Sequence, residues 1–310
     1  MKVTALAGGV GGAKLVDGLA QCLSPSDLNV IINTADDFKH FGLHISPDID
    51  TVCYTLAGIS NIQTGWGRED ESWVVRHSIR DLGGPDWFKL GDKDIATHLE
   101  RTRRLNLGEK LDSITKYFCN KWGIKINVIP MSNDLVMTTV QTQDNGEIPF
   151  QEYFVKYHCQ PKVKGFIFRG IEKADPAPGV IDSILKADVI IICPSNPWVS
   201  IDPILTLKDF RKTLKTKCVI AISPIINGKA LRGPAAKMFK EMGIIPSALA
   251  VADHYRDVIS GFVVHKTDLN EIAQIEQWSI MTTALDIIMS NKAHRKRLAQ
   301  EVLIFCDQLI

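Results

Sequence analysis

Short apolar runs alternate with amphipathic stretches from the start of the chain. Val3–Ala7 is an apolar run, glycines and an amphipathic stretch at 13–22 follow it, and Leu28–Ile32 is a second apolar run. This order of strand, loop, helix and strand predicts a βαβ unit, in which the two strands are parallel.

Further apolar runs predict more strands, and helical patterns fall between several of them. The runs lie at 126–129, 163–168, 189–193 and 219–222. Strands that are apolar throughout are typical of a parallel sheet with helices on both faces. We therefore expect an α/β fold, with a doubly wound, mostly parallel, Rossmann-like sheet.

Residues from about 47 to 123 follow a different pattern. Pro47 suits the first turn of a helix, and helical spacing extends over 48–57, 69–82, 94–106 and 109–122. We expect a single domain over residues 1–310, with a helical insertion at about 47–123 that caps the carboxyl-terminal edge of the sheet.

The composition of the chain excludes several classes of binding partner. The chain has 310 residues and a formal net charge of +1, so no overall field draws it to nucleic acid or to an acidic membrane. No apolar stretch approaches the ~20 residues that cross a bilayer, and the N-terminal run is too short for a signal peptide. The seven cysteines are scattered without a CxxC pair, which favours reduced core cysteines over zinc ligands or disulfides. We expect a cytoplasmic protein.

A glycine-rich segment joins the first strand to the first helix, with the sequence Ala7-Gly8-Gly9-Val10-Gly11-Gly12-Ala13-Lys14. Glycines let a backbone turn tightly and approach a ligand, and a helix N-terminus offers free N–H groups to a phosphate. The pattern matches neither standard fingerprint. A Walker loop requires a hydroxyl where Leu15 stands, and a dinucleotide loop requires a third glycine where Lys14 stands. The density of glycines nevertheless favours a phosphate site over a plain tight turn.

Four aspartates follow closely. Asp36 and Asp37 come directly after the second strand, at the edge of the sheet where the glycine loop is expected, and Asp48 and Asp50 fall in the first turn of the next helix. Carboxylates in a first turn stabilise the helix dipole, although one would suffice for that. A hard divalent cation that joins carboxylates to phosphate oxygens explains the group better. The spacing does not tell which aspartates take that role.

Aromatic and polar segments complete the set of candidates. Trp87 and Phe88 are explained equally well by a wall for a flat ring system and by ordinary core packing. The segments that begin at Ser195 and Ser223 follow apolar runs, and each predicts a rigid polar loop. Nucleotide recognition and plain turns account for these loops equally well.

Taken in order, these segments resemble the 2-phospho-L-lactate transferase family, called CofD in archaea and FbiA in actinobacteria. The resemblance covers the chain from Val3 to about Leu298. It is carried by GGVGGAKLVDGL, NTADDF, GLHISPDIDTVCYTLAG, GWG, DWFKLGDKDIATHL, PMSND, CPSNPWVSIDPIL and SPIINGKALRGPAAKM. Each block alone is weakly specific, whereas their joint order is highly specific.

The resemblance implies a magnesium-dependent transferase. Such enzymes move a phospholactyl or phosphoenolpyruvyl group from a guanosine-diphosphate-linked donor to the ribityl hydroxyl of 8-hydroxy-5-deazariboflavin (Fo). Guanosine monophosphate leaves, and the product is un-glutamylated coenzyme F-420-0. The expected partners are these small molecules and Mg²⁺. The sequence does not show whether the donor acid is lactyl, enolpyruvyl or glyceryl, and a homodimer is expected only because symmetric pairs are common.

The resemblance also implies roles for single residues. Asp50 and Lys89 occupy positions that contact Fo, and Asp37 and Asp50 match acidic positions implicated in metal binding and catalysis. Asp50 is alternatively the group that orients or deprotonates the attacking hydroxyl. Trp87 and Phe88, with the tryptophan of GWG, are candidates to flank the deazaflavin ring. The residues expected around the donor are Gly8, Gly9, Val10, Gly11, Gly12, Lys14, Asn33, Ser195, Asn196, Ser223 and Gly228.

Two other interpretations stay open. A nicotinamide-dependent oxidoreductase with an altered Rossmann loop would use Asp36 to bind the ribose, although the missing third glycine counts against it. A sugar-nucleotide-binding regulator of the gluconeogenesis-factor group would share the glycine loop but would lack the GWG and DWF…GD segments.

Overall fold

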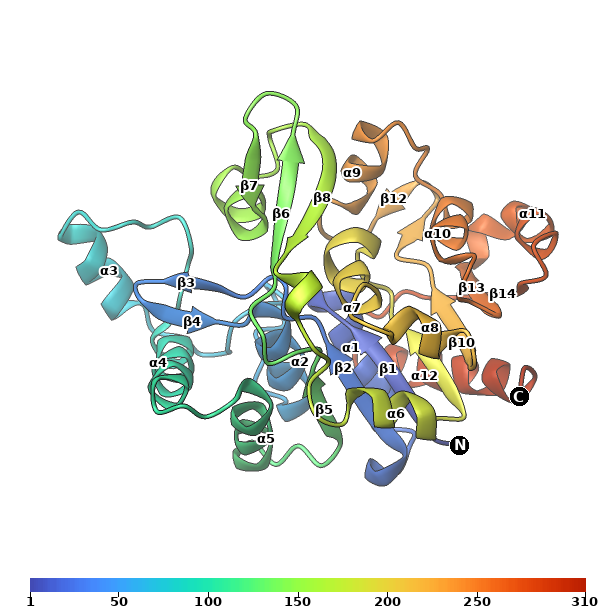
Figure 1. Cartoon of the computed structure of the whole chain (residues 1–310), viewed down its shortest axis with the longest axis horizontal. Helices are drawn as coiled ribbons and strands as arrows, with labels where there is room; N and C mark the ends of the chain where they lie inside the picture. The colour runs from blue at the N-terminus through green and yellow to red at the C-terminus, as the bar shows by residue number, and fades with distance from the viewer.

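The computed structural model describes residues 1–310 and contains a seven-stranded sheet with helices on both faces (Figure 1). The strand order is β14-β13-β10-β9-β1-β2-β5, and every neighbouring pair is parallel. The strands are β1 (Val3–Ala7), β2 (Leu28–Ile32), β5 (Asn127–Pro130), β9 (Val189–Ile192), β10 (Cys218–Ile222), β13 (Gly261–His265) and β14 (Met281–Leu285). The predicted doubly wound α/β class is confirmed, and β13 and β14 are additional to the predicted strands.

The central strands are apolar because both of their faces are covered. β1 is buried at every position. Leu6 belongs to a core of 43 buried residues on one face of the sheet, and Ala5 and Ala7 belong to a core of 31 on the other. Successive residues of a strand point to opposite faces, so this one strand contributes to both cores.

Helices from different parts of the chain cover the two faces. The face with the smaller core is covered by α1 (Gly9–Ala20), α2 (Pro47–Ala57), α5 (Leu111–Lys121) and α12 (Lys292–Asp307). The other face is covered by α6 (Val180–Lys186), α7 (Asp202–Leu205), α8 (Phe210–Leu214), α9 (Ala235–Glu241), α10 (Ala248–Tyr255) and α11 (Ile272–Glu276). A buried ion pair between Asp17 and Arg295 joins α1 to α12. None of the helices is both long enough and apolar enough to cross a membrane.

The strand order places a switch point beside β1. From β1 the chain moves outward through β2 to β5, returns to β9 on the other side of β1, and moves outward again through β10, β13 and β14. Connections that leave two adjacent strands in opposite directions open a crevice at the carboxyl ends of those strands, where doubly wound sheets bind ligands. The glycine loop follows β1 and the segment 193–196 follows β9, so both lie at this crevice.

Three smaller sheets lie outside the main one. They are the hairpin of β3 (Phe38–His40) and β4 (Leu43–Ile45), the hairpin of β11 (Ile225–Ile226) and β12 (Lys229–Ala230), and the antiparallel sheet of β6 (Met137–Thr142), β7 (Glu147–Pro149) and β8 (Val163–Arg169). The run at 163–168 is thus a strand, as predicted, but it pairs with β6 and not with the main sheet. Most of its positions are only partly buried, and an antiparallel sheet tolerates solvent on one face.

Residues 47–123 carry α2, α3 (Val74–Asp81), α4 (Asp92–Asn106) and α5, and no strand of the main sheet. In Figure 1, α3 and α4 lie with the β3–β4 hairpin at the left of the view, far from the C-terminus. Helical spacing predicts a helix from Glu69, but α3 begins only at Val74. The Asp92 carboxylate accepts hydrogen bonds from the Val74 and Val75 N–H groups, both at 3.1 Å, and these bonds stabilise the start of the helix at that point.

Candidate active site

The glycine loop packs directly on the loop that follows β9. A Cβ on Gly11 would lie 2.1 Å from the carbonyl oxygen of Pro194, and one on Gly12 would lie 2.8 Å from the Ser195 hydroxyl oxygen. The Ser195 hydroxyl donates a hydrogen bond to the Gly8 carbonyl at 2.7 Å. This close approach of two backbones is one physical reason for the glycines.

The N-terminus of α1 faces a carboxylate. Gly9 has a φ of +61°, a conformation that favours glycine, and its N–H donates to Asp48 Oδ1 at 2.7 Å. Asn33 Nδ2 donates to Asp48 Oδ2 at 3.0 Å. Asp48 therefore lies against the positive end of the helix dipole. The other N–H groups of the first turn have no partner within the helix and are available to an anion.

The four aspartates that follow β2 are all buried. Burial raises the pKa of Asp36 well above its usual value, and the charge of Asp48 raises it further. Burial also raises the pKa of Asp48 to about 6, and the Asp37 carboxylate contributes to that rise. Burial raises the pKa of Asp37 as well. These three carboxylates oppose one another's ionisation, so a cation between them would stabilise their charged forms.

The oxygen atoms of this group differ in their partners. Asp37 Oδ2 lies 3.0 Å from His44 Nε2 and accepts a hydrogen bond from Ser46 Oγ at 2.6 Å. Asp37 Oδ1 and Asp36 Oδ1 are buried without any partner. Carboxylate oxygens are the ligands that Mg²⁺ prefers, so these atoms fit such an ion. No three His, Cys, Asp or Glu side chains are already arranged as a metal site.

Asp50 has a different environment from the other three. Both of its oxygens bind the guanidinium of Arg101, a fully buried side chain of α4, and Arg101 Nη1 lies 3.1 Å from Asp50 Oδ2. His98 Nδ1 lies 3.1 Å from the same nitrogen. The charge of Asp50 is thus already compensated within the protein.

Asp94 extends this network towards the surface. The Tyr54 hydroxyl donates to Asp94 Oδ1 at 2.7 Å, and His98 Nε2 lies 3.6 Å from the same oxygen. Burial raises the pKa of Asp94 to about 7, and the charge of Asp50 adds to the rise. Burial lowers the pKa of His98 well below its usual value, and the Arg101 charge lowers it further, so the imidazole is neutral.

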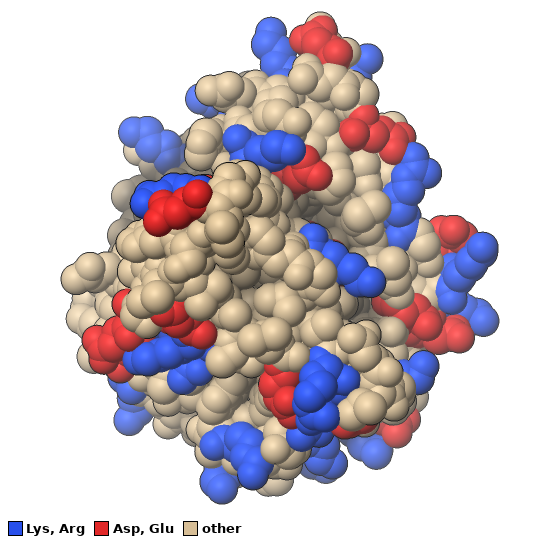
Figure 2. All heavy atoms as spheres, turned by 90° about the vertical axis from the view of Figure 1, so that its left-hand side faces the viewer, with Lys and Arg blue, Asp and Glu red and all other residues tan.

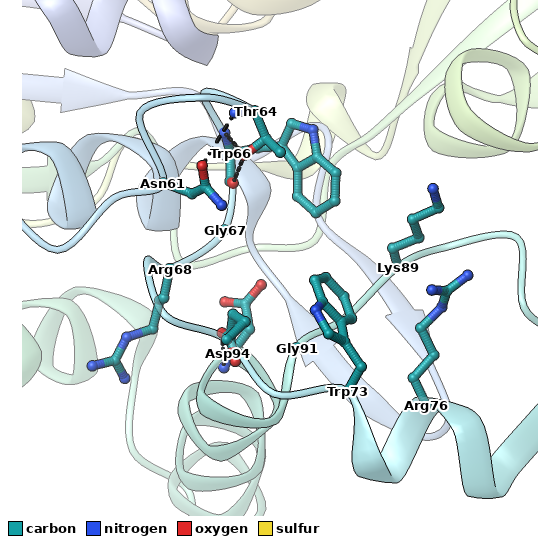
Figure 3. A pocket seen from close by; sticks show the side chains of 11 residues that line it. Asn61, Thr64, Trp66, Gly67, Arg68, Trp73, Arg76, Lys89, Gly91 and Asp94 are labelled. Atoms are coloured by element: carbon teal, nitrogen blue, oxygen red, sulfur yellow. Dashed lines mark hydrogen bonds between the residues drawn. The ribbon is translucent and has the colours of Figure 1, made fainter.

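Two adjoining cavities, of about 190 and about 60 Å³, open beside the network. Figure 3 shows the indole rings of Trp66 and Trp73 on two sides of the larger cavity, with Lys89 and Arg76 beside them. The cavities share Trp66, Gly67, Lys89 and Asp94. The larger cavity therefore combines aromatic walls with cationic side chains, which suits a flat polar ring system.

The face of the molecule that carries α3 has no surface of a single charge. Figure 2 shows acidic and basic side chains lying side by side around a largely uncharged centre. Long-range attraction of a strongly charged macromolecule requires a surface of one sign.

Of the residues predicted to contact the acceptor, all but one line a cavity. Asp50, Phe88 and Lys89 line the smaller cavity. Trp87 lines neither cavity, because its ring packs against Phe38 and His40, with ring centroids 6.1 and 5.1 Å away. Sequence reasoning missed most of the residues that line the larger cavity, among them Trp73 and Arg76, since no local pattern marks which side chains near α3 face inward.

The side chains predicted around the donor mostly shape the loops at the carboxyl ends of the strands. Asn33 contacts Asp48, as described, and Ser195 holds the glycine loop. Asn196 Oδ1 accepts a hydrogen bond from the Trp198 N–H at 3.1 Å. Ser223 Oγ donates within its own loop at 2.8 Å, and Gly228 has a φ of +71° in the β11–β12 turn. Lys14 is half-buried on α1, and burial lowers its pKa.

Known proteins show which family this arrangement belongs to. The family model of the 2-phospho-L-lactate transferase CofD matches residues 3–302. A phosphoenolpyruvate transferase of Kitasatospora aureofaciens is 39% identical, over 100% of this chain and 99% of its own length, and one of Thermobifida fusca is 41% identical over 88% of each chain. A solved structure of a UPF0052-family protein of Bacillus halodurans shares the fold, with a TM-score of 0.63 and 15% identity over 97% of this chain and 99% of that one. The chain belongs to the CofD family of transferases.

Proposed function

We propose that this transferase moves a phosphoenolpyruvyl group from a guanosine-diphosphate-linked donor to the ribityl hydroxyl of Fo. Guanosine monophosphate leaves, and the product is the dehydro form of coenzyme F-420-0. Family membership supports transfer of a phospho-acid group, and the two relatives described above are named phosphoenolpyruvate transferases. These names favour the enolpyruvyl donor over the lactyl and glyceryl donors.

The observation that carries the proposal is the proximity of the glycine loop to the wall of the larger cavity. The loop at 61–68 carries Trp66, and a Cβ on Gly65 would lie 3.4 Å from Val10 Cγ1 of the glycine loop. A phosphate held at the start of α1 and a ring held in the cavity would therefore be neighbours. A transfer between a diphosphate and an alcohol requires that proximity.

The carboxylates divide into two groups with different proposed roles. Asp37 and Asp50 are the metal ligands that the resemblance implies, but both oxygens of Asp50 bind Arg101, whereas Asp37 keeps a buried oxygen without a partner. We therefore assign Mg²⁺ to Asp37 with Asp36, whose Oδ1 atom is likewise buried without a partner. Bound there, the ion would neutralise charge on the diphosphate. The free N–H groups of α1 and the Lys14 ammonium contribute to the same field.

Asp50 is assigned to the acceptor. The deazaflavin ring lies between Trp66 and Trp73 in this proposal, and the ribityl chain extends through the smaller cavity towards Asp50. The Asp50 carboxylate, held in place by Arg101, accepts a hydrogen bond from the hydroxyl and directs its oxygen at the phosphorus. The new P–O bond forms as the bond to the guanosine monophosphate oxygen breaks, and the proton of the hydroxyl passes to the Asp50 carboxylate.

We also propose that residues 1–310 act as a single domain, in which the part of residues 47–123 between α2 and α5 caps the active edge of the sheet. The larger cavity is lined entirely by residues from this segment. The glycine loop and the loops after β9 and β10 supply the donor side. The cap would thus bind the acceptor, and the loops of the sheet would bind the donor.

Mass spectrometry tests the proposed reaction. Purified protein is incubated with Fo, Mg²⁺ and each of the three guanylylated acids in turn. We expect dehydro-F-420-0 with the enolpyruvyl donor, and far less product with the lactyl and glyceryl donors. Protein that forms no product but binds a uridine diphosphate sugar would support a regulator, and protein that binds only a nicotinamide nucleotide would support an oxidoreductase.

A further inference from the structure

Arg232 connects two loops that belong to opposite halves of the fold. It follows β12, and its Nη1 donates a hydrogen bond to the Thr64 carbonyl oxygen at 2.7 Å. Thr64 lies in the crossover from β2 to β5, on the other side of β1 from β10. The loop at 61–68 that Arg232 reaches also carries Trp66, a wall of the larger cavity.

The guanidinium lies against bare backbone beside the glycine loop. Gly65 has a φ of +77°, and a Cβ there would lie 2.1 Å from Arg232 Nη1 and 3.4 Å from Val10 Cγ1. Any side chain at Gly65 would displace the guanidinium. The position of Arg232 thus depends on a glycine in the opposite half of the molecule.

The charge of Arg232 has no acidic partner. Its hydrogen bond is to a neutral carbonyl, whereas other arginines of the same half pair with aspartates, among them Arg211 and Arg297. Burial lowers the pKa of Lys14, and the charge of Arg232 lowers it further, so the two cations oppose each other. An anion bound between two such cations removes this repulsion.

We propose that Arg232 is a positioning residue that binds the diphosphate of the donor while it holds the Thr64 carbonyl, so that the donor orders the acceptor cavity. This inference rests on the function proposed above. A guanidinium has five N–H donors in a planar fork and binds a phosphate and a carbonyl at the same time. The side chain is exposed, and a bound diphosphate restricts its rotamers before the acceptor arrives.

The experiment measures how GDP changes the affinity for Fo. Fo fluorescence gives its dissociation constant with and without saturating GDP and Mg²⁺. In the native chain we expect GDP to tighten Fo binding by about 10-fold, within the usual range of coupling between two sites. In Arg232→Ala this effect disappears, while the affinity for Fo alone changes by less than about 2-fold, because the lost contact is exposed.

Two further variants make the test specific. Arg232→Lys keeps the charge without the planar fork, so it binds GDP more tightly than Arg232→Ala but still lacks the coupling. Arg256→Ala, which removes another exposed arginine of the same half, keeps the full coupling. If GDP tightened Fo binding to Arg232→Lys as much as to the native chain, the role assigned to the planar guanidinium would be overturned.

The outcomes separate this inference from the proposed function. Coupling that survives in Arg232→Ala overturns the inference. Loss of Fo binding in that variant without GDP also overturns it, because the residue would then be structural. Native protein that binds GDP and Fo without coupling overturns the inference and leaves the proposed function intact. Native protein that binds neither ligand overturns the proposed function.

Discussion

At the scale of single residues, the role of each buried carboxylate in the site depends on which groups compensate its negative charge. Asp50 is matched by Arg101, whereas Asp36 and Asp37 each keep a buried oxygen without a partner. Removing one member of a buried ion pair leaves the other as an uncompensated charge, which is costly, while replacing both by neutral groups is often harmless. This difference allows the catalytic and structural roles of Asp50 to be measured separately.

Asp50→Asn alone should lower both stability and turnover. We expect the free energy of unfolding to fall by about 3–5 kcal/mol, because Arg101 keeps its charge, and turnover to fall by about 100-fold. The double variant Asp50→Asn with Arg101→Met should regain most of the stability but none of the turnover. Urea unfolding and initial rates measure the two effects. Native turnover in the double variant would exclude the proposed role of Asp50.

The raised pKa of Asp94 predicts that the stability of the protein depends on pH. The pKa of Asp94 in the folded chain is about 7, above the ~3.9 of an unfolded aspartate. A raised carboxyl pKa contributes stability that is fully present below the unfolded pKa and is lost as pH rises through the folded one. The contribution of Asp94 therefore falls between about pH 4 and pH 7, by at most about 1.4 kcal/mol per pH unit.

Asp94→Asn removes this titration and leaves an oxygen to accept the Tyr54 hydrogen bond. We expect the variant to gain stability relative to the native chain as pH rises from 5 to 8. Urea unfolding at several pH values measures the difference. Two stability curves that stay parallel over this range would contradict the raised pKa.

At the scale of elements, Asp92 of α4 stabilises the first turn of α3, and Glu71, which precedes α3, stabilises the first turn of α4. Asp92 accepts hydrogen bonds from two N–H groups of α3, each at 3.1 Å, and Glu71 accepts two from α4, at 2.8 and 2.9 Å. Trp73 and Arg76, which line the larger cavity, lie at the start of α3. The reciprocal caps therefore position one wall of the cavity.

Asp92→Ala should loosen this wall without disturbing the crevice. We expect a lower free energy of unfolding, as for other lost helix caps, and weaker binding of Fo with unchanged binding of GDP. Asp81→Ala, at the other end of α3, serves as the matched control and should leave both affinities unchanged. Fluorescence titrations measure them. If Asp92→Ala weakened the binding of GDP as much as the binding of Fo, the cap would stabilise the whole fold and not only the wall of the cavity.

At the scale of the whole molecule, the two directions of winding meet at one crevice. β1 and β9 are adjacent, and the loops that follow them are packed against each other through Gly11 and Pro194. A ligand bound there contacts segments far apart in the sequence. Ligand binding to the folded state alone stabilises it, by about 2.7 kcal/mol at a concentration of 100 times the dissociation constant.

GDP with Mg²⁺ should therefore raise the temperature of thermal unfolding more than GDP alone. Asp37→Asn should lose the magnesium-dependent part of that increase and keep the remainder, because the N–H groups of α1 still bind phosphate. Asp253→Asn, at an exposed position, is the control. If magnesium raised the unfolding temperature of Asp37→Asn as much as that of the native chain, Asp37 would not be a metal ligand.

The sequence by itself determined the local frame of this protein. β1, the glycine loop and α1 follow from an apolar run, residues without a Cβ and an amphipathic period, which all act within a few positions. The parallel α/β class follows from the same repetition along the chain. The blocks that carry the family resemblance are likewise local, so the transferase family was also readable from the sequence.

Only the tertiary structure decided which side chains meet. Asp50 binds Arg101 across 51 residues, and Arg232 binds Thr64 across 168. The run at 163–168 shows the pattern of a strand but not which strand it pairs with, and Trp87 was predicted at the acceptor site but packs among other rings. A local pattern specifies a backbone conformation and a buried face, whereas the partner on that face depends on the order in which the strands are arranged in the folded sheet.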